Sequence, residues 1–230
     1  MKLINHINIK GKIKVKTGLH IGGGSDTIQI GGTDNPVIKD PLTNRPFIPG
    51  SSLKGKLRSI LEWKLGKTGK PDRKGNIGPC DCGELNCPIC TMFGAGSTNA
   101  QSKELGPSRL IFRDAFLSDE FETKVKEEGL QLTEIKAETA IDRAKGNAKS
   151  GSLRQTERVC AGVEFDFNIS CRIFDQNDDN GKADIKNLKA LKEAFDELKY
   201  EALGGNGSRG YGRIEIEFDK PIDEIIKENS

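Results

Sequence analysis

The sequence has little of the material that several classes of protein need. Only two of its 230 residues are histidine, and catalysis by histidine generally requires a second acid or base beside the first. No apolar run approaches the roughly 20 residues that cross a bilayer, and the first residues, MKLINHINIK, lack the apolar core of a signal peptide. We therefore expect a cytoplasmic protein that does not act at a membrane.

The net charge is only +2, but the charges are unevenly distributed along the chain. Residues 1–20 contain five lysines and no acid, whereas residues 215–228 contain six acids and two lysines. The fold is thus expected to have a basic side that suits a polyanion and an acidic side that suits a neighbouring copy of the chain. Ordinary solvated faces are the alternative that charge alone leaves open.

The hydrophobic pattern predicts an α+β protein with one core. Period-2 alternation or a continuous apolar run indicates strands, and spacing of three and four residues indicates helices. The predicted strands cover 7–15, 109–117, 163–173 and 214–218, and the predicted helices run from Ser51 or Ser52 to Leu65 and over 185–201. Their order, β-α-β-β-α-β, is the ferredoxin-like order that RNA-recognition folds also use. We therefore predict a single domain, 1–230, in which Cys171 belongs to the core.

Two segments interrupt this order and are predicted to be insertions. Residues 66–100 are rich in glycine, proline, lysine and cysteine, and residues 118–157 contain a charged helix over 118–128 followed by an arm. The arm, 134–157, has few apolar anchors and is expected to be mobile.

Four clustered cysteines predict a metal site in the first insertion. Cys80, Cys82, Cys87 and Cys90 follow the spacing C-x-C-x4-C-x2-C in a chain without a secretory signal. Four nearby thiolates can complete a tetrahedral shell around zinc, and a full shell favours a structural ion over a catalytic one. A labile disulfide pair and a redox or iron–sulfur role are the alternatives that remain open.

Two glycine-rich stretches are candidates for binding phosphate. PGSSLKGKLR places a Gly-Ser-Ser turn at a helix start, with Lys54 and Arg58 on one face. GGNGSRGYGR (204–213) combines flexible glycines with arginines, and Tyr211 within it is able to stack on a base. The first stretch is equally explained by a serine that caps a helix beside solvated lysines, and the second by a simple hairpin turn. GGG at 22–24 is equally ambiguous.

Taken together, several stretches resemble one known family. They are TGLHIGGG (17–24), DNPVIKD (34–40), PFIPGSSLKGKLR (46–58), FGAG (93–96), RLIFRDAF (109–116), ERVCAGVEFDF (157–167) and LGGNGSRGYGRI (203–214). In this order and density they resemble the repeating backbone subunit of the type III-A CRISPR effector, the Csm complex, a member of the RAMP superfamily.

The resemblance implies a ferredoxin-like core whose copies stack along a CRISPR RNA together with other subunits of the Csm complex. Each copy would project a thumb hairpin, expected within 134–157, and cleave the paired target RNA at regular intervals with a divalent cation, expected to be magnesium. The matching catalytic residue is Asp34. The matching RNA contacts are His20, Lys54, Arg58, Gly207, Arg209 and Gly210.

The residues themselves leave the catalytic role open. Asp34 precedes Asn35-Pro36, where an aspartate more often closes a turn than does chemistry, and only the resemblance favours catalysis. His20 is its rival, but the other histidine, His6, lies at the edge of the first predicted strand. Asp40 and Asp114 are further carboxylates near these motifs, and a structural hydrogen bond is favoured for Asp114. A non-catalytic RNA-binding scaffold is the competing function.

Overall fold

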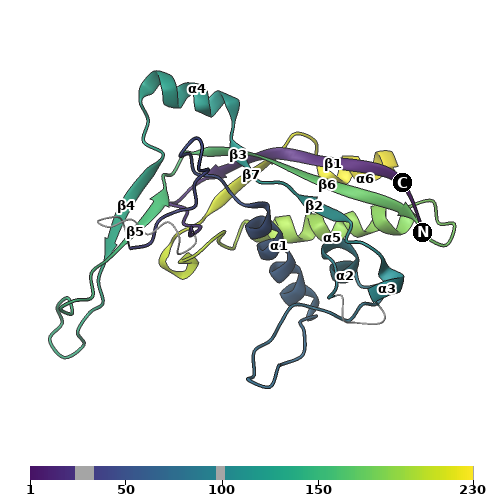
Figure 1. Cartoon of the computed structure of the whole chain (residues 1–230), viewed down its shortest axis with the longest axis horizontal. Helices are drawn as coiled ribbons and strands as arrows, with labels where there is room; N and C mark the ends of the chain where they lie inside the picture. Colours follow the sequence, from purple (N-terminus) through teal and green to yellow (C-terminus); the bar gives the residue numbers. More distant parts are fainter. Residues whose placement is uncertain (24–33, 97–101, 230) are drawn as a thin grey trace.

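A long antiparallel sheet organises the chain, and the computed structural model describes residues 1–23, 34–96 and 102–229 (Figure 1). Strands β1 (Lys2–Val15) and β6 (Glu164–Asp175) pair along almost their whole length. Strand β7 (Ile214–Phe218) pairs with the other edge of β1, while β2 (Leu110–Phe112) and β3 (Phe116–Leu117) pair with β6. The strand order is therefore β2-β6-β1-β7, with β3 also on β6.

Helices α1 (Gly50–Leu65), α5 (Lys182–Leu198) and α6 (Ile222–Asn229) complete the core. Helix α1 packs against α5, and α6 packs on α5 (Figure 1). The alternating strand residues and the helical stripes meet in one buried cluster. Rings of Phe167, Phe195 and Phe218 lie 5.1–6.0 Å apart within it, and each such pair contributes about 0.5–1.5 kcal/mol beyond its burial.

The predicted order of elements is found as β1, α1, β2 with β3, β6, α5 and β7. The predicted continuous strand over 109–117 is divided, because Ala115 pairs with Ile48 instead of β6. The second helix begins and ends three residues earlier than predicted, and α6 was not predicted at all. Cys171 is buried in the core, as predicted.

The second insertion consists of a helix and a hairpin. Helix α4 (Asp119–Glu128) matches its prediction, and the Ser118 hydroxyl accepts the Phe121 N–H at its start. Strands β4 (Thr133–Glu138) and β5 (Arg154–Val159) pair as a two-stranded sheet that projects from the core (Figure 1). The arm, expected to be mobile, thus has a regularly paired base.

The first insertion includes the short helix α2 (Pro88–Phe93). Helix α3 (Ser102–Leu105) follows it. Residues 97–100 of the predicted insertion, like Gly24 of the GGG stretch, lie outside the described residues. No helix in the described part of the chain is long and apolar enough to span a bilayer.

Two local predictions are wrong. Neither serine caps α1: Pro49 occupies the cap position, and the Gly50 N–H donates to Asp114 Oδ1 at 2.8 Å. The expected basic side does not form at Lys14 and Lys16 either, because acids on neighbouring strands face both lysines. Lys14 pairs with Glu164 at 2.9 Å and Lys16 with Glu215 at 3.0 Å.

Candidate functional site

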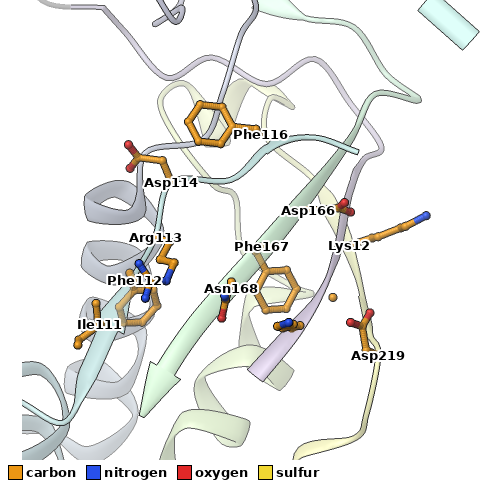
Figure 2. Close-up of a pocket in the computed structure, with 12 residues that line it drawn as sticks. Lys12, Ile111, Phe112, Arg113, Asp114, Phe116, Asp166, Phe167, Asn168 and Asp219 are labelled. Atoms are coloured by element: carbon orange, nitrogen blue, oxygen red, sulfur yellow. The ribbon is translucent and has the colours of Figure 1, made fainter. Parts of the chain in front are cut away.

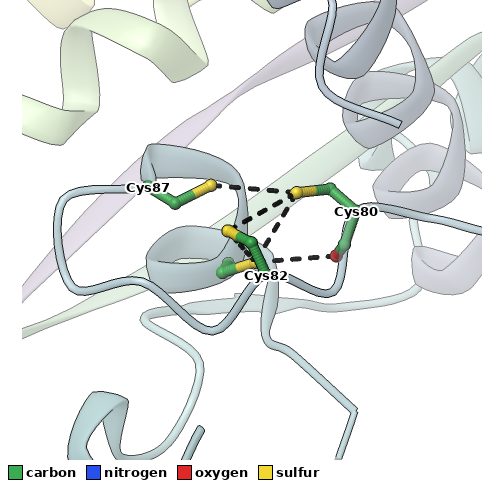
Figure 3. A group of neighbouring side chains, drawn as sticks. Cys80, Cys82 and Cys87 are labelled. Carbon is green, nitrogen blue, oxygen red and sulfur yellow. Dashed lines mark hydrogen bonds between the residues drawn. The ribbon is translucent and has the colours of Figure 1, made fainter. Parts of the chain in front are cut away.

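The four clustered cysteines converge on one point (Figure 3). Neighbouring Sγ atoms of Cys80, Cys82, Cys87 and Cys90 are 3.7–3.9 Å apart in four pairs. Four sulfurs at about 2.3 Å from a tetrahedral zinc ion would be separated by about 3.8 Å, whereas a disulfide requires about 2.05 Å. Among the described residues, no other group of three or more histidines, cysteines or acids is close enough to share an ion.

Burial makes a bound cation the natural partner of these sulfurs. Cys80, Cys87 and Cys90 are buried, and burial raises the pKa of the Cys80 and Cys90 thiols. A metal ion offsets this cost, because it binds the thiolate and releases the proton. The residues therefore fit a metal such as zinc.

Helix α1 holds the first of these cysteines by its backbone. The Cys80 N–H donates to Glu62 Oε1 at 2.9 Å, and Arg58 Nη2 donates to the Cys80 carbonyl oxygen at 2.6 Å. Arg58 Nε also donates to Glu62 Oε1 at 2.9 Å, and the arginine side chain is only 17% exposed. The ion pair thus bonds to both the N–H and the carbonyl group of Cys80. The predicted RNA contact at Arg58 stays a prediction, and the structure gives the side chain two protein partners.

Lys54 lies one turn before Arg58 and is in a different electrostatic situation. No described residue forms a hydrogen bond or ion pair with its ammonium group. Partial burial, together with the positive charges of Arg58 and Arg172, lowers the pKa of Lys54. A half-buried cation among other cations favours an anion as its missing partner.

Asp34 lies at the root of the hairpin, on the edge of β5 that β4 leaves open. Its Oδ2 accepts the Gln155 N–H at 2.9 Å. Asn35 continues the contact, because its N–H donates to the Gln155 carbonyl and its own carbonyl accepts the Glu157 N–H at 2.9 Å. The Asp34 side chain is exposed. One carboxylate oxygen is thus fixed by backbone, and the residue faces solvent beside the arm.

Glu157 of β5 organises this edge, and sequence reasoning gave it no role. Its Oε2 accepts the Val37 N–H at 3.0 Å, and its Oε1 accepts Lys39 Nζ at 2.6 Å. The side chain is almost fully buried. Burial alone would raise its pKa, but the bonds from Lys39, Val37 and Thr133 outweigh burial and lower the pKa of Glu157. The only sequence signal was its position at the start of the ERVCAGVEFDF motif.

His20 reaches the same strand from the segment that follows β1. Its Nδ1 lies 2.7 Å from the Glu157 carbonyl oxygen, which can only accept, so Nδ1 carries a proton and Nε2 is the nitrogen left to other partners. Asp34 and His20 therefore contact β5 two residues apart, a rise of about 7 Å along the strand.

The glycine-rich loop packs directly on His20. The Gly205 N–H donates to the His20 carbonyl at 2.8 Å. Gly204 has φ +76°, and a Cβ there would lie 2.3 Å from the His20 oxygen, so only glycine fits this contact. In the same loop, the 3₁₀ turn Gly207–Arg209 precedes Gly210, and Arg209 Nη1 donates to Glu138 Oε2 of β4 at 2.8 Å.

The proposed base-stacking role of Tyr211 is wrong. The side chain is 1% exposed, and its hydroxyl donates to Glu138 Oε1 at 3.0 Å. Lys136 Nζ lies 4.6 Å from the ring centroid and the Arg158 guanidinium 5.1 Å. Tyr211 therefore joins the glycine-rich loop to the arm and has no face left for a base.

The two remaining carboxylates of the predicted site have structural partners. Asp40 Oδ1 accepts the N–H groups of Leu42 and Thr43, which with the Thr43 hydroxyl lowers its pKa. Asp114 lies beside the first turn of α1, at the rim of a groove on the face of the sheet that carries Lys10 and Lys12 (Figure 2). Its structural hydrogen bond to Gly50 was predicted correctly. Neither Asp34 nor any predicted RNA contact lines that groove.

The structure thus brings the predicted residues into two groups. Asp34, His20 and the glycine-rich loop meet on the arm, while Lys54 and Arg58 lie on α1, the second of them bonded to the cysteine cluster. The family model described as the RAMP superfamily matches residues 12–215. The chain belongs to the RAMP superfamily.

Comparison with individual proteins assigns the chain to a narrower family. It is 45% identical to the CRISPR system Cms endoribonuclease Csm3 of Methanocaldococcus jannaschii, over 96% of this chain and 83% of that protein. It is 39% identical to the Csm3 endoribonuclease of Streptococcus thermophilus, over 92% and 87%. A crystal structure of a Csm3–Csm4 subcomplex of the type III-A CRISPR-Cas interference complex matches with TM-score 0.59 and 28% identity, over 99% and 96%. Within the RAMP superfamily, the chain belongs to the Csm3 endoribonuclease family, which confirms the resemblance seen in the motifs.

Proposed function

We propose that the chain is a repeating backbone subunit of a type III-A CRISPR ribonucleoprotein. In this role it binds CRISPR RNA, stacks with further copies of itself and with other Csm subunits, and cleaves complementary target RNA at regular intervals. One observation carries the proposal: the carboxylate of Asp34 is fixed by the backbone of β5 at the root of the projecting hairpin, yet stays exposed. The relatives of the chain are named as endoribonucleases.

A fixed, exposed carboxylate suits RNA cleavage. The neighbouring 2′-hydroxyl of RNA supplies the nucleophile, so the protein has to hold the target in line and manage a proton or charge at the phosphate. Asp34 Oδ2 is held by the Gln155 N–H, and Oδ1 has no partner among the described residues. A divalent cation, magnesium in our proposal, would stabilise charge that develops on the phosphate. Asp34 is the residue of this chain that would hold it.

His20 fits a contact to the ribose. Because Nδ1 is engaged by the Glu157 carbonyl, Nε2 of the neutral ring is an acceptor and suits a 2′-hydroxyl donor. Lys54, a half-buried cation without a partner among the described residues, suits a phosphate. We assign Gly207, Arg209, Gly210 and Arg58 to the same RNA path by their match to the family.

The architecture proposed for this role is a ferredoxin-like core with two insertions. The antiparallel order β7-β1-β6-β2 and the packing of α1 against α5 support it. The insertion 118–157 would supply the thumb, formed by β4 and β5. The insertion 66–100 would be a zinc-binding lobe, in which Cys80, Cys82, Cys87 and Cys90 hold a structural ion and brace α1.

The test compares the unmodified chain with Asp34→Ala in an assembled complex that contains guide RNA, complementary target and magnesium. We expect the variant to bind target normally and to lose cleavage. Equal cleavage by both would remove Asp34 from the chemistry. Binding without cleavage by both would leave the chain as a non-catalytic scaffold.

A further inference from the structure

The two tyrosines of the sequence are in opposite environments. Tyr211 is buried beneath Lys136 and Arg158, whereas Tyr200 is 88% exposed. Tyr200 follows the end of α5, where its N–H donates to the Glu197 carbonyl at 2.9 Å. Its backbone is thus held and its ring is exposed to solvent. An exposed aromatic ring on a fixed backbone is a ready stacking surface.

Tyr200 lines a groove between the end of α5, helix α1 and the glycine-rich loop. Three cations and a single carboxylate, Glu201, also line it. The cations are Lys56, Lys199 and Arg213. Gly207 and Gly210 form part of the opposite wall. An aromatic ring among cations, beside a glycine-rich backbone, is the combination that single-stranded nucleic acids use.

The walls of this groove are held in place by short contacts. Lys56 Nζ lies 2.9 Å from Glu201 Oε2. The Leu203 N–H donates to the Gly212 carbonyl at 2.9 Å, and the Gly212 N–H donates to Gly18 at 3.0 Å. Gly212 has φ +72°, and a Cβ there would lie 2.0 Å from the Leu203 oxygen. The groove is therefore formed before a ligand arrives, which lowers the entropy cost of binding.

We propose that this groove binds one nucleotide of single-stranded RNA, with its base stacked on Tyr200 and its flanking phosphates near Lys199 and Arg213. The proposal rests on the proposed function, since it extends the RNA path beyond the glycine-rich loop. RNA is favoured over a protein partner because the lining holds three cations and one acid, with Asp196 pairing Lys199 from outside it, and because the groove is continuous with that loop.

The chain supplies a matched control. Trp63 of α1 is also exposed, at 65%, and Lys56 Nζ lies 6.0 Å from its ring centroid. Trp63 does not line the groove. Loss of this aromatic ring therefore tests non-specific binding by exposed rings, while every residue that lines the groove is kept.

The experiment measures RNA affinity of the full chain with a fluorescent single-stranded RNA, and cross-linking in the assembled complex with a guide that carries 5-iodouridine. We expect Tyr200→Ala to weaken binding about 5- to 150-fold, the loss typical of one stacked base. Tyr200→Phe and Trp63→Ala should stay within about twofold of the unmodified chain. The cross-link should map to Tyr200.

Each other outcome has a distinct meaning. Unchanged affinity in Tyr200→Ala, while the unmodified chain binds RNA, overturns the subsite and leaves the proposed function intact. Normal RNA affinity with fewer copies per assembled complex assigns the groove to a protein neighbour and overturns it as well. No RNA binding by the unmodified chain or its complex contradicts the proposed function itself.

Discussion

The cysteine lobe and the arm are built in different ways. In the lobe, the four sulfurs come from eleven consecutive residues, Cys80 to Cys90, and a partly buried ion pair on α1 holds the backbone of the first cysteine. On the arm, Asp34 and His20 meet β5 from more than 120 residues away in sequence. Metal ligands made locally suit a structural centre, whereas an exposed carboxylate held by distant segments suits a site that meets a large ligand.

The two regions also differ in what holds them. Metal–sulfur bonds would dominate the lobe, whose insertion has few apolar residues of its own. The arm depends on one buried carboxylate, Glu157, which joins the Asp34 segment through Val37 and Lys39. A substitution in one region should therefore leave the fold of the other region unchanged.

The largest effect is expected in the lobe. Cys87→Ser should lose the bound zinc and unfold the described part of the insertion, because structural zinc contributes its binding free energy to folding. Metal analysis should fall from one ion per chain to none, and limited proteolysis should cut within residues 66–96. Cys160→Ser, which changes a cysteine outside the cluster, is the control. Retention of zinc and of protease resistance in Cys87→Ser would contradict a structural centre.

A smaller effect is expected on the arm. Glu157→Gln should lower the free energy of unfolding by about 1–3 kcal/mol, since it removes the buried negative charge that accepts Lys39 Nζ and the Val37 N–H. The folded pKa of Glu157 is below its usual 4.5, so its stabilisation is fully present above about pH 4.5 and disappears as the pH falls through the folded value. Denaturation at several pH values should show the two proteins converging in acid. A difference that grows as the pH falls would contradict this role.

The smallest effect distinguishes two neighbours on α1. Arg58→Ala should weaken zinc retention about 10- to 100-fold, as expected for a residue that orients a ligand, because Arg58 holds the Cys80 carbonyl. Lys54→Ala should leave zinc unchanged and lower the salt dependence of RNA binding by about one phosphate contact. Competition with a chelator measures the first effect and titration at several salt concentrations the second. If both variants changed zinc retention and the salt dependence of RNA binding equally, the two residues would not have different roles.

Prediction from sequence succeeded where the relevant contacts are local. Cysteine spacing predicted the cluster, and apolar periodicity predicted the order of the main elements. Prediction from sequence failed where segments that are far apart in the chain meet. At the start of α1, Asp114 accepts the Gly50 N–H in place of an adjacent serine, and acids from β6 and β7 pair with Lys14 and Lys16.

The tyrosines show the same limit. A tyrosine in a glycine-rich loop is expected from the sequence to be exposed. Tyr211 is buried instead, because its hydroxyl donates to Glu138 of the arm, 73 residues away in sequence. Glu157 escaped notice because a glutamate in a strand gives no signal until its partners at Val37 and Lys39 are placed. The family resemblance supplied Asp34, since the pattern around it predicts only a turn.

The central claim is that the edge of the arm cleaves RNA while the lobe only braces the fold. The most direct test is the single-turnover cleavage rate, per bound target, of complexes assembled with Asp34→Asn or with Cys82→Ser. An asparagine oxygen still accepts the Gln155 N–H, so the first variant keeps its fold. We predict that it loses about a hundredfold or more in rate, while the second cleaves at the normal rate per folded complex. A normal rate in Asp34→Asn, or its loss in a folded Cys82→Ser complex, would contradict the account.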